Sequence, residues 1–396
     1  MNILHLSTYR STGGAAIAAQ RITKSLAAAR ISDPDLDLCQ SFVSSENTLF
    51  HSFKLKISGT LTKLFSVNTR LHQSIDLFPS NLHRVINDSP FDIVHLYWVH
   101  DEFLPIHSIS KISKPIVWTL HDHWIIQGST HIPPIHPSLL PPDVQRSPHG
   151  LFPLIDFDKW LYQRKAHLSL ESIYPVAPSR WLTQRTNASR TFRHQCRTIP
   201  NPISVCNTNH TSHHRNARSF HGPTILFVAS SFNTDHNKGY HLLKTALTKL
   251  LNLCTFTLVT VGDLPPVDDV LPFTCIHLGI IPDPKELHSI YTSVDVTVIP
   301  SIFDNMPQVA VESLLHRTPV VAFNAGGVPD IITSTDLGFL AEPYSTDDLA
   351  RNIFKVISRY PHTHIHSSST SYNTLVESVS QPAIAKQYIS LYKSIL

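Results

Sequence analysis

Short apolar segments alternate with helix-forming segments along both halves of the chain, and this alternation constrains the fold more than any other feature. Apolar strands are expected at residues 3–7, 93–98, 116–120, 224–229, 256–261, 274–278, 294–299 and 319–323, and residues 174–182 are expected to be a strand that runs into a helix start. Helices are expected at residues 15–29, 159–172, 240–252, 284–292, 307–316 and 383–395. Strands that alternate with helices predict parallel sheets covered by helices on both faces.

A polar, histidine-rich stretch at residues 200–223 separates the two halves and is interpreted as a linker with a surface loop. A chain of 396 residues is also too long for one compact core. The sequence therefore predicts an α/β protein of two doubly wound, Rossmann-like domains, residues 1–203 and 204–382, facing a central cleft. In such domains ligands bind beyond the carboxyl ends of the strands.

Composition narrows the class of partner and the compartment. The formal net charge is only +3 and no long basic run occurs, so we expect no binding to nucleic acid. The five cysteines are far apart and form no CxxC, which fits a reducing cytoplasm. The first residues, MNILHLSTYR, are typical of a strand rather than a signal peptide, and no apolar stretch is long enough to span a bilayer.

Two histidine tracts, at residues 210–214 and 362–366, lie in Ser/Thr-rich stretches without acidic partners. A metal site needs a set of ligands that converge, so we interpret both tracts as loops and expect no metal ion or other cofactor.

Two strand-to-helix turns have features of phosphate sites. Gly13 and Gly14 follow the first strand, where backbone N–H groups at a helix N-terminus suit a phosphate. A tight turn explains the pair equally well, because neither GxGxxG nor GxxxxGK is present. Lys238 and Gly239 open a helix in the second half. A cation is unfavourable at a helix N-terminus, which mildly favours a diphosphate partner over a merely solvated lysine.

The stretch SIFDNMPQVAVESLLHRTPVVAFNAGGVPDII, residues 301–332, joins a buried strand to a helix expected to start near Met306 or Pro307. Asn305 is a candidate N-cap, with Gln308 as its capping-box partner. Asp304 lies just before the helix, and Glu312 lies at the edge of its apolar stripe. These acids are either a cap with a boundary glutamate or groups that hold a ligand.

This stretch and several other segments, which follow the order of the family's motifs along almost the entire chain, resemble the nucleotide-sugar glycosyltransferases of family 4, which have the GT-B fold. Residues 304–312 are similar to the E-x7-E region of that family, and TPVVAFNAGGVPDII is similar to its strand and Gly-Gly loop. The other similar segments are Gly13-Gly14, TLHDHW (119–124), APSRWL (177–182), IPNPI (199–203), NKG (237–239) and DVTVIPS (295–301). The members that look most similar build bacterial exopolysaccharide or O-antigen chains.

The resemblance implies a role for each matching residue. Glu312 would hold the ribose hydroxyls of the donor, since a carboxylate accepts two hydrogen bonds from a diol. Asp304 would contact the donor sugar, His121 would face the reacting sugar, and Lys238 would lie beside the diphosphate. The backbone approach to the donor would use Gly13, Gly14, Gly326 and Gly327, and the diphosphate would be held by backbone N–H groups of the segment Asn305, Met306, Pro307 and Gln308.

The resemblance also implies an activity. The chain would be a retaining, metal-independent hexosyl- or related glycosyltransferase, with a glycan or lipid-linked acceptor at the cytoplasmic membrane face, acting in polysaccharide biosynthesis. Its C-terminal helix, residues 383–396, would pack back on the first domain. Lys54, Lys56, Lys63 and Arg70 are candidates for membrane contact, although sparse charges are more typical of a solvated helix face.

Two alternatives remain open. A nucleotide-sugar epimerase of the same fold would need no acceptor, and a non-catalytic member would only bind a nucleotide sugar or a partner transferase. The sequence departs from the family at several positions. The Gly-rich turn after HDHW is reduced to Gly128-Ser129, and the loop acid after Gly-Gly is Asp330 rather than glutamate. Asp304 stands where glutamate is usual, and no arginine precedes Lys238 in ASSFNTDHNKG. These departures bear on donor affinity and donor choice rather than on the fold.

Overall fold

The computed structural model divides the chain into two compact units, which are described here one at a time. The structure describes residues 1–11, 13–32, 38–44, 49–66, 72–141, 151–168, 170–203, 220, 222–263, 270–361 and 363–396. The first unit comprises Met1–Pro134, Pro142–Ser204 and Val379–Leu396, and the second comprises Ile135–Pro141 and Val205–Ser378. Most of the expected linker at residues 200–223 lies outside the described residues.

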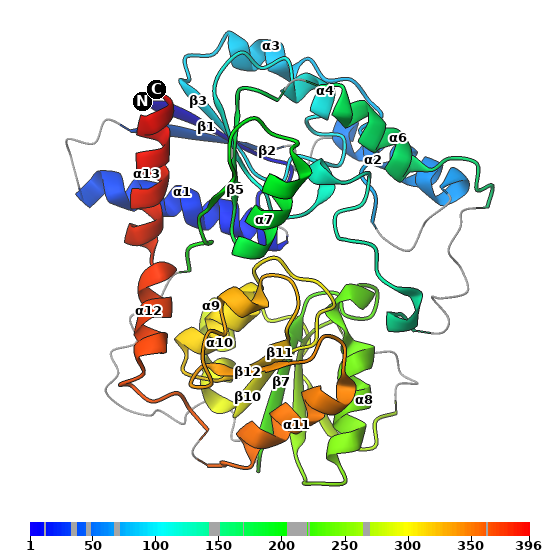
Figure 1. Cartoon of the computed structure of the whole chain (residues 1–396), viewed down its shortest axis with the longest axis vertical. Coiled ribbons are helices and arrows are strands. Elements are labelled where there is room, and N and C mark those ends of the chain that lie inside the picture. The colour runs from blue at the N-terminus through cyan, green and yellow to red at the C-terminus, as the bar shows by residue number, and fades with distance from the viewer. Residues whose placement is uncertain are drawn as a thin grey trace. The chain divides into compact units, whose positions relative to one another are not determined.

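The first unit is built on a parallel sheet of six strands in the order β2-β1-β3-β4-β5-β6, of which Figure 1 labels β1, β2, β3 and β5. The strands are β1 (Asn2–Ser7), β2 (Cys39–Ser44), β3 (Ile93–Leu96), β4 (Ile116–Thr119), β5 (Ile173–Ala177) and β6 (Arg197–Thr198). Its helices are α1 (Gly14–Ser32), α2 (Leu49–Phe65), α3 (Leu82–Asn87), α4 (Ile106–Ile109), η1 (Trp124–Ile126), α6 (Phe157–Ala166), α7 (Arg180–Ser189) and α13 (Gln381–Ile395). Every residue of β3 and β4 is buried, as the apolar runs predict for inner parallel strands.

The second unit repeats this design with the strand order β12-β11-β10-β7-β8-β9. The strands are β7 (Thr224–Ala229), β8 (Thr257–Gly262), β9 (Thr274–His277), β10 (Val296–Ile299), β11 (Val320–Phe323) and β12 (Gly338–Ala341). The helices are η2 (Pro137–Leu139), η3 (His236–Lys238), α8 (Tyr240–Leu250), α9 (Pro284–Ser293), α10 (Gln308–Leu315), η4 (Val328–Asp330), α11 (Thr346–Ile357) and α12 (Thr370–Ser378). All recorded strand pairs in both sheets are parallel, so the predicted pair of doubly wound α/β domains is confirmed.

One predicted helix is too long. Residues 159–172 were expected to be helical throughout, but α6 ends at Ala166. The Lys165 ammonium donates to the main-chain oxygens of Trp124 and Gly128, and the backbone leaves the helix at His167. The apolar residues beyond it belong instead to the approach to β5.

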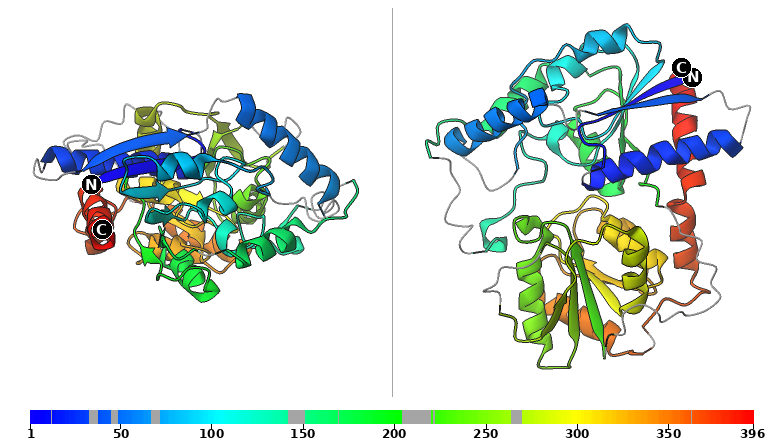
Figure 2. Two further views of the ribbon diagram at one scale, coloured as in Figure 1. Left: turned by 90° about the horizontal axis from the view of Figure 1, so that it is seen from above. Right: turned by 180° about the vertical axis from the view of Figure 1, so that it is seen from behind.

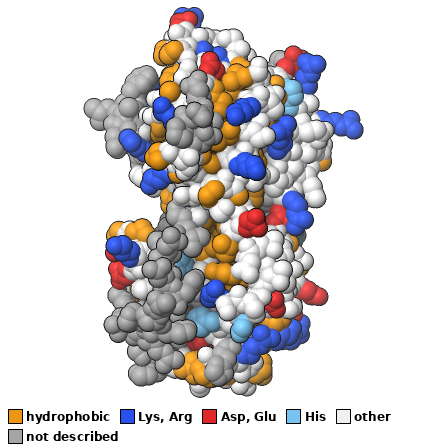
Figure 3. Space-filling view, turned by 90° about the vertical axis from the view of Figure 1, so that its left-hand side faces the viewer, with side chains coloured by type: hydrophobic (Ala, Val, Ile, Leu, Met, Phe, Trp, Pro, Cys, Tyr) orange, Lys and Arg blue, Asp and Glu red, His pale blue; other side chains and the backbone are white. Residues whose placement is uncertain are grey.

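Surface chemistry agrees with the composition. On the face shown in Figure 3, Lys and Arg side chains are scattered among polar and apolar ones rather than gathered into one basic surface. In the described part of the chain, no helix is long and apolar enough to cross a membrane. Cys39, Cys196, Cys254 and Cys275 are free thiols.

The C-terminal helix α13 packs in the first unit beside α1, as Figures 1 and 2 show. Buried hydrogen bonds fix it to the sheet. The hydroxyl of Tyr392 lies 2.6 Å from His95 Nδ1, and the hydroxyl of Tyr388 lies 2.9 Å from Thr119 Oγ1. Thr119 Oγ1 also lies 2.8 Å from His95 Nε2, so Thr119 joins strand β4, strand β3 and the helix. Burial holds the pKa of His95 well below its usual value, and the ring is neutral.

Thr119→Val tests this network with almost no change in side-chain shape. The variant removes a partner from both His95 and Tyr388, and a buried polar group left without a partner costs about 1–3 kcal/mol. We expect urea denaturation to show the first unit destabilised by at least that amount. Thr248→Val on α8 is the control, because its hydroxyl donates to Lys244 O at an exposed position and should change stability by less than about 0.5 kcal/mol. Equal effects of the two substitutions would contradict the role given to Thr119.

Candidate functional site

Three loops meet at the carboxyl edge of the second unit's sheet. They follow β7, β10 and β11, which are neighbours in the sheet, and they carry most of the predicted donor-binding residues. Because the carboxyl ends of parallel strands share one edge, residues that are far apart in sequence come together there.

Lys238 and Asp304 form an ion pair across two of these loops. Lys238 Nζ lies 3.1 Å from Asp304 Oδ2, and the side chains are 34% and 18% exposed, so a ligand can reach both. The carboxylate of Asp304 raises the pKa of Lys238 above its usual value, and the lysine is therefore a firm cation. An ammonium group carries three N–H donors, and the bond to Asp304 uses one of them.

Asn237 holds the loop before Asp304 in place, a role that the sequence analysis missed. Its side chain donates to Phe303 O at 2.7 Å and accepts from Phe303 N at 2.9 Å, and its backbone oxygen accepts from Ile302 N at 2.8 Å. The next glycine, Gly239, has φ +69°, and a Cβ there would lie 1.9 Å from Pro300 O. The NKG segment therefore contains two residues that fix the loop on either side of the lysine.

The Gly326-Gly327 pair packs against the backbone of Asp304. Gly327 N donates to Asp304 O at 2.8 Å, and Gly326 has φ +61°. A Cβ on Gly326 would lie 2.1 Å from the same oxygen. The adjacent glycines thus allow the loop after β11 to touch the loop after β10. Their predicted approach to the donor stays a prediction.

Helix α10 begins later than predicted and is capped differently. Its first residue is Gln308 and its N-cap position is Pro307, whose side chain cannot make a cap hydrogen bond. The predicted capping box of Asn305 with Gln308 is therefore wrong, because the proline turns the chain in extended geometry before the helix starts. The sequence analysis predicted that backbone N–H groups of Asn305, Met306, Pro307 and Gln308 hold the diphosphate. Pro307 has no N–H, so it cannot be one of these donors.

Glu312 lies on α10 at the edge of the buried stripe, as predicted from the helical period. Val311 and Leu314 beside it are buried, whereas Glu312 is half-buried. Its Oε2 accepts a hydrogen bond of 3.2 Å from the hydroxyl of Tyr291, and the ring of His316 stacks on Tyr291. Tyr291 thus helps to orient the carboxylate, which in its ionised form only accepts hydrogen bonds.

The predicted residues of the first unit lie at the carboxyl edge of its own sheet. His121 follows β4 and is half-buried, and its Nε2 is buried with no hydrogen-bond partner in the described part of the chain. Burial lowers the pKa of His121 to about 4, so the ring is neutral at pH 7.

Gly13 and Gly14 open helix α1, and both are exposed. Gly13 has φ +88°, but a Cβ there would meet nothing within 4 Å. A glycine is therefore needed at position 13 for the backbone conformation and not for a close approach within the unit. The predicted contact of Gly13 and Gly14 with the donor stays a prediction.

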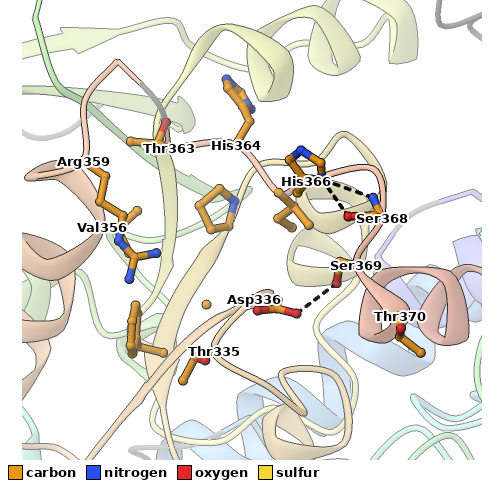
Figure 4. A pocket seen from close by; sticks show the side chains of 14 residues that line it. Thr335, Asp336, Val356, Arg359, Thr363, His364, His366, Ser368, Ser369 and Thr370 are labelled. Atoms are coloured by element: carbon orange, nitrogen blue, oxygen red, sulfur yellow. Dashed lines mark hydrogen bonds between the residues drawn. The ribbon is translucent and has the colours of Figure 1, made fainter.

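A cavity of about 460 Å³ lies at the opposite edge of the second unit's sheet (Figure 4). Its lining includes Pro319 and Gly338, which stand at the amino ends of β11 and β12. His364 and His366 of the second predicted histidine loop also line it and are exposed, whereas the first tract, residues 210–214, lies outside the described residues. The cavity is therefore separate from the Lys238–Asp304 loops.

Gly326→Ala measures how much the loop contact contributes. Gly279 is a matched control, because its φ of +70° imposes the same backbone strain while a Cβ there meets nothing within 4 Å. We expect Gly279→Ala to lower the free energy of unfolding by about 1–2 kcal/mol. Gly326→Ala should lower it by at least about 1 kcal/mol more, because Asp304 O must move. Chemical denaturation measures both values, and equal losses would show that the close approach carries no energy.

Comparison with known proteins agrees with this geometry. Residues 222–359, which hold Lys238, Asp304, Glu312 and the glycine pair, match the model of the family Glycosyl transferases group 1. The 2-deoxystreptamine glucosyltransferase of Streptomyces kanamyceticus is 30% identical over 34% of this chain and 36% of its own length. WcaC of Escherichia coli K12, whose name assigns it to colanic acid biosynthesis as a glycosyl transferase, is 24% identical over 72% of this chain and 68% of its own length. The match thus spans only about a third of the Streptomyces relative.

Solved structures share the fold along the full chain. The Anabaena protein HepE, solved in complex with UDP and glucose, has a TM-score of 0.59 with 15% identity, and the alignment covers all of both chains. At this identity the similarity establishes the fold alone. The resemblance predicted from the sequence motifs is confirmed: the chain has the GT-B fold, and its residues 222–359 match the family Glycosyl transferases group 1.

Proposed function

We propose that the protein is a retaining glycosyltransferase that transfers a sugar from a nucleotide-diphospho-sugar to a glycan or lipid-linked acceptor in polysaccharide biosynthesis. The observation that carries the proposal is the Lys238–Asp304 pair beside the start of α10, with Glu312 on the same helix. This arrangement lies within the segment that matches a glycosyltransferase family. The UDP and glucose bound by HepE and the polysaccharide role in the name of WcaC support the donor class and the pathway class.

Each group of the second unit has chemistry that suits one part of such a donor. Glu312 would accept hydrogen bonds from the two ribose hydroxyls, and Asp304 would contact the donor sugar. As the bond from the sugar to the diphosphate breaks, negative charge builds on the leaving diphosphate. Lys238 and the N-terminus of α10 would stabilise that charge without reorganising, because both are already fixed by the fold.

In the first unit, His121, at the end of β4, would face the reacting sugar and help to place it. A neutral imidazole offers one donor and one acceptor, which suits a sugar hydroxyl. Transfer would proceed without a metal ion, since the cationic lysine and the helix N-terminus already supply positive charge for the diphosphate. No enzymatic nucleophile is part of the proposal.

Membrane contact stays a prediction. Lys54, Lys56 and Lys63 lie on helix α2, and Arg70 lies outside the described residues. Phe152 and Leu154, next to the end of α2 through backbone hydrogen bonds to Leu64 and Phe65, are exposed apolar residues. Basic and apolar groups together suit an anionic lipid surface, so we propose a cytoplasmic protein with peripheral contact at the inner membrane face.

Glu312→Gln tests the donor site while retaining an oxygen that can accept from Tyr291. Losing two hydrogen bonds to a charged group, each worth about 1.5–3 kcal/mol, should weaken nucleotide binding more than about 100-fold. Calorimetric titration with UDP, GDP and ADP, and with their sugars, measures the effect. Glu377→Gln on α12, an exposed acid, should leave the affinity unchanged.

The same titration, combined with assays of sugar transfer and of sugar interconversion, separates the alternative functions. Binding without transfer to any acceptor, together with interconversion of the sugar, would favour an epimerase, and binding without any turnover would favour a non-catalytic protein. Unchanged affinity in Glu312→Gln would remove the proposed ribose contact.

Metal independence is tested by chelation. We expect the initial rate of sugar transfer at 25 °C to be the same in EDTA as in its absence, because Lys238 takes the place that a divalent ion would occupy beside the diphosphate. Lys238→Ala should then lower the rate by at least about 100-fold, in line with the loss of one preorganised electrostatic group. A rate that vanishes in EDTA and returns with Mg²⁺ or Mn²⁺ would contradict the mechanism.

A further inference from the structure

Histidine and aspartate side chains gather in the first unit where the chain leaves β3 and β4. His100 and Asp101 follow β3, Asp122 follows β4, and His131 lies nine residues beyond Asp122. One ligand atom from each of His100, Asp122 and His131 can be chosen so that all lie within 4.8 Å of one another. None of these residues was selected by the sequence analysis, which looked for metal ligands only in the two histidine tracts.

Asp122 is the centre of this cluster. Its Oδ2 lies 2.6 Å from His131 Nδ1 and accepts a hydrogen bond of 2.7 Å from Trp98 Nε1. Its Oδ1 accepts from Trp124 N at 3.0 Å and lies 3.9 Å from His100 Nε2. The carboxylate is thus oriented by two groups that are not titratable, and both histidines face it.

The cluster has the connectivity of a Ser–His–Asp triad but not its chemistry. Ser74 Oγ lies 2.8 Å from His131 Nε2, which completes the sequence Ser74, His131, Asp122. However, the Ser74 hydroxyl donates its proton to Asp101 Oδ1 at 2.7 Å, and the residue is 3% exposed. Asp101 also accepts from Tyr9 and faces His72 Nε2, so it is an acceptor that retains the serine proton. Ser74 therefore cannot pass that proton to His131, and a nucleophilic role is excluded.

We propose that His100, Asp122 and His131 bind a divalent first-row transition-metal ion such as Zn²⁺. Two imidazoles and one carboxylate are a common donor set for these ions. Tetrahedral ligands at about 2.0–2.1 Å from an ion are roughly 3.3 Å apart. The 2.6 Å separation joins His131 Nδ1 to Asp122 Oδ2, and the 3.9 Å separation joins His100 Nε2 to Asp122 Oδ1. These values lie on either side of that distance, so both imidazoles already face the carboxylate as ligands of one ion would.

The surroundings of the cluster match what metal ligands require. A histidine that ligates through one nitrogen usually donates the other N–H to an oriented acceptor. His131 Nε2 faces Ser74 Oγ, which is fixed in turn by Asp101. His100 is packed against the ring of Trp124 at 4.2 Å, and its backbone oxygen accepts from Thr8 Oγ1 at 2.7 Å. Both imidazoles are therefore held before any ion arrives.

The proposed ion would join two loops that hydrogen bonds already hold together. One loop follows β3 and contains His100, and the other follows β4 and contains His121, Asp122 and His131. Because the ion adds to an existing framework, its effect is on the stability of these loops, and it is not a requirement for sugar transfer. The site is independent of the donor chemistry proposed above.

The test uses the full chain after chelation, with Zn²⁺ as the probe. The chain has 26 histidines, so surface binding contributes to any total, and the difference between variants is the informative quantity. Equilibrium dialysis with metal analysis should show one fewer tightly bound equivalent in His100→Gln and in His131→Gln than in the wild type. His366→Gln, at an exposed histidine of the second unit, should show no such loss. Zn²⁺ should raise the thermal midpoint of the wild type and not that of the two cluster variants.

Two results would overturn the proposal. One is the same number of tightly bound equivalents in the wild type and in both cluster variants, with circular dichroism showing all three folded. The other applies even if the variants fail to fold. Co²⁺ replaces Zn²⁺ at sites of this type, and the wild type should show visible absorption of a four- or five-coordinate ion that saturates at one equivalent. Absence of that absorption in the wild type would remove the site.

Discussion

The candidate site of the second unit depends on backbone segments that approach one another more closely than side chains allow. Gly326 lies against Asp304 O, and Gly239 lies against Pro300 O, each at a distance that no Cβ could occupy. The two contacts fix the loop after β10 from both sides, and the paired hydrogen bonds between Asn237 and Phe303 hold it in register. Asp304 therefore reaches Lys238 from a rigid loop, and this is the condition for electrostatic preorganisation.

In the first unit, polar side chains are buried in uncharged form between the sheet and the C-terminal helix. His95, Thr119, Tyr388 and Tyr392 satisfy one another between the sheet and α13, so the C-terminal helix is bound by directional contacts as well as by apolar packing. The strand residues that follow this network carry His121 and Asp122 to the edge of the sheet. Strand β4 therefore determines both the packing of α13 and the position of His121.

Much of the fold could be predicted because parallel strands are buried on both faces and appear as continuous apolar runs. β7, β10 and β11 lie within one or two residues of their predicted bounds. By contrast, β2 has alternating burial and a cysteine and glutamine at its start, and β12 begins with a glycine, so neither was predicted. The predicted end of α6 was wrong. The helix stops at Ala166, next to Lys165, whose ammonium donates to a main-chain oxygen of another segment, and local propensity does not contain such tertiary contacts.

The residues of the candidate site that come after the carboxyl ends of strands could be predicted from the sequence. Lys238, Asp304 and the glycine pair come together because their strands are neighbours, and each could be selected from its place after an apolar run. Asn237 was missed because its role is a pair of hydrogen bonds to the backbone of another loop, and any polar residue would look the same in sequence. The cluster around Asp122 was missed for a related reason. Its members come from the loop after β3 and the loop after β4, and only the structure shows that they converge.

The ion pair between Lys238 and Asp304 connects two of the departures from the family pattern. The acid is shorter by one methylene than the usual glutamate, and the usual arginine before the lysine is absent. A shorter acid on a rigid loop lies against the lysine, so the cation that remains is partly neutralised. In the proposed reaction, the N-terminus of α10 would then supply a larger share of the positive field at the diphosphate. A donor diphosphate would be bound by the ammonium N–H groups that the contact with Asp304 does not use, and the same ion pair would keep the carboxylate of Asp304 beside the donor. One lysine would thus serve both phosphate binding and the positioning of the sugar.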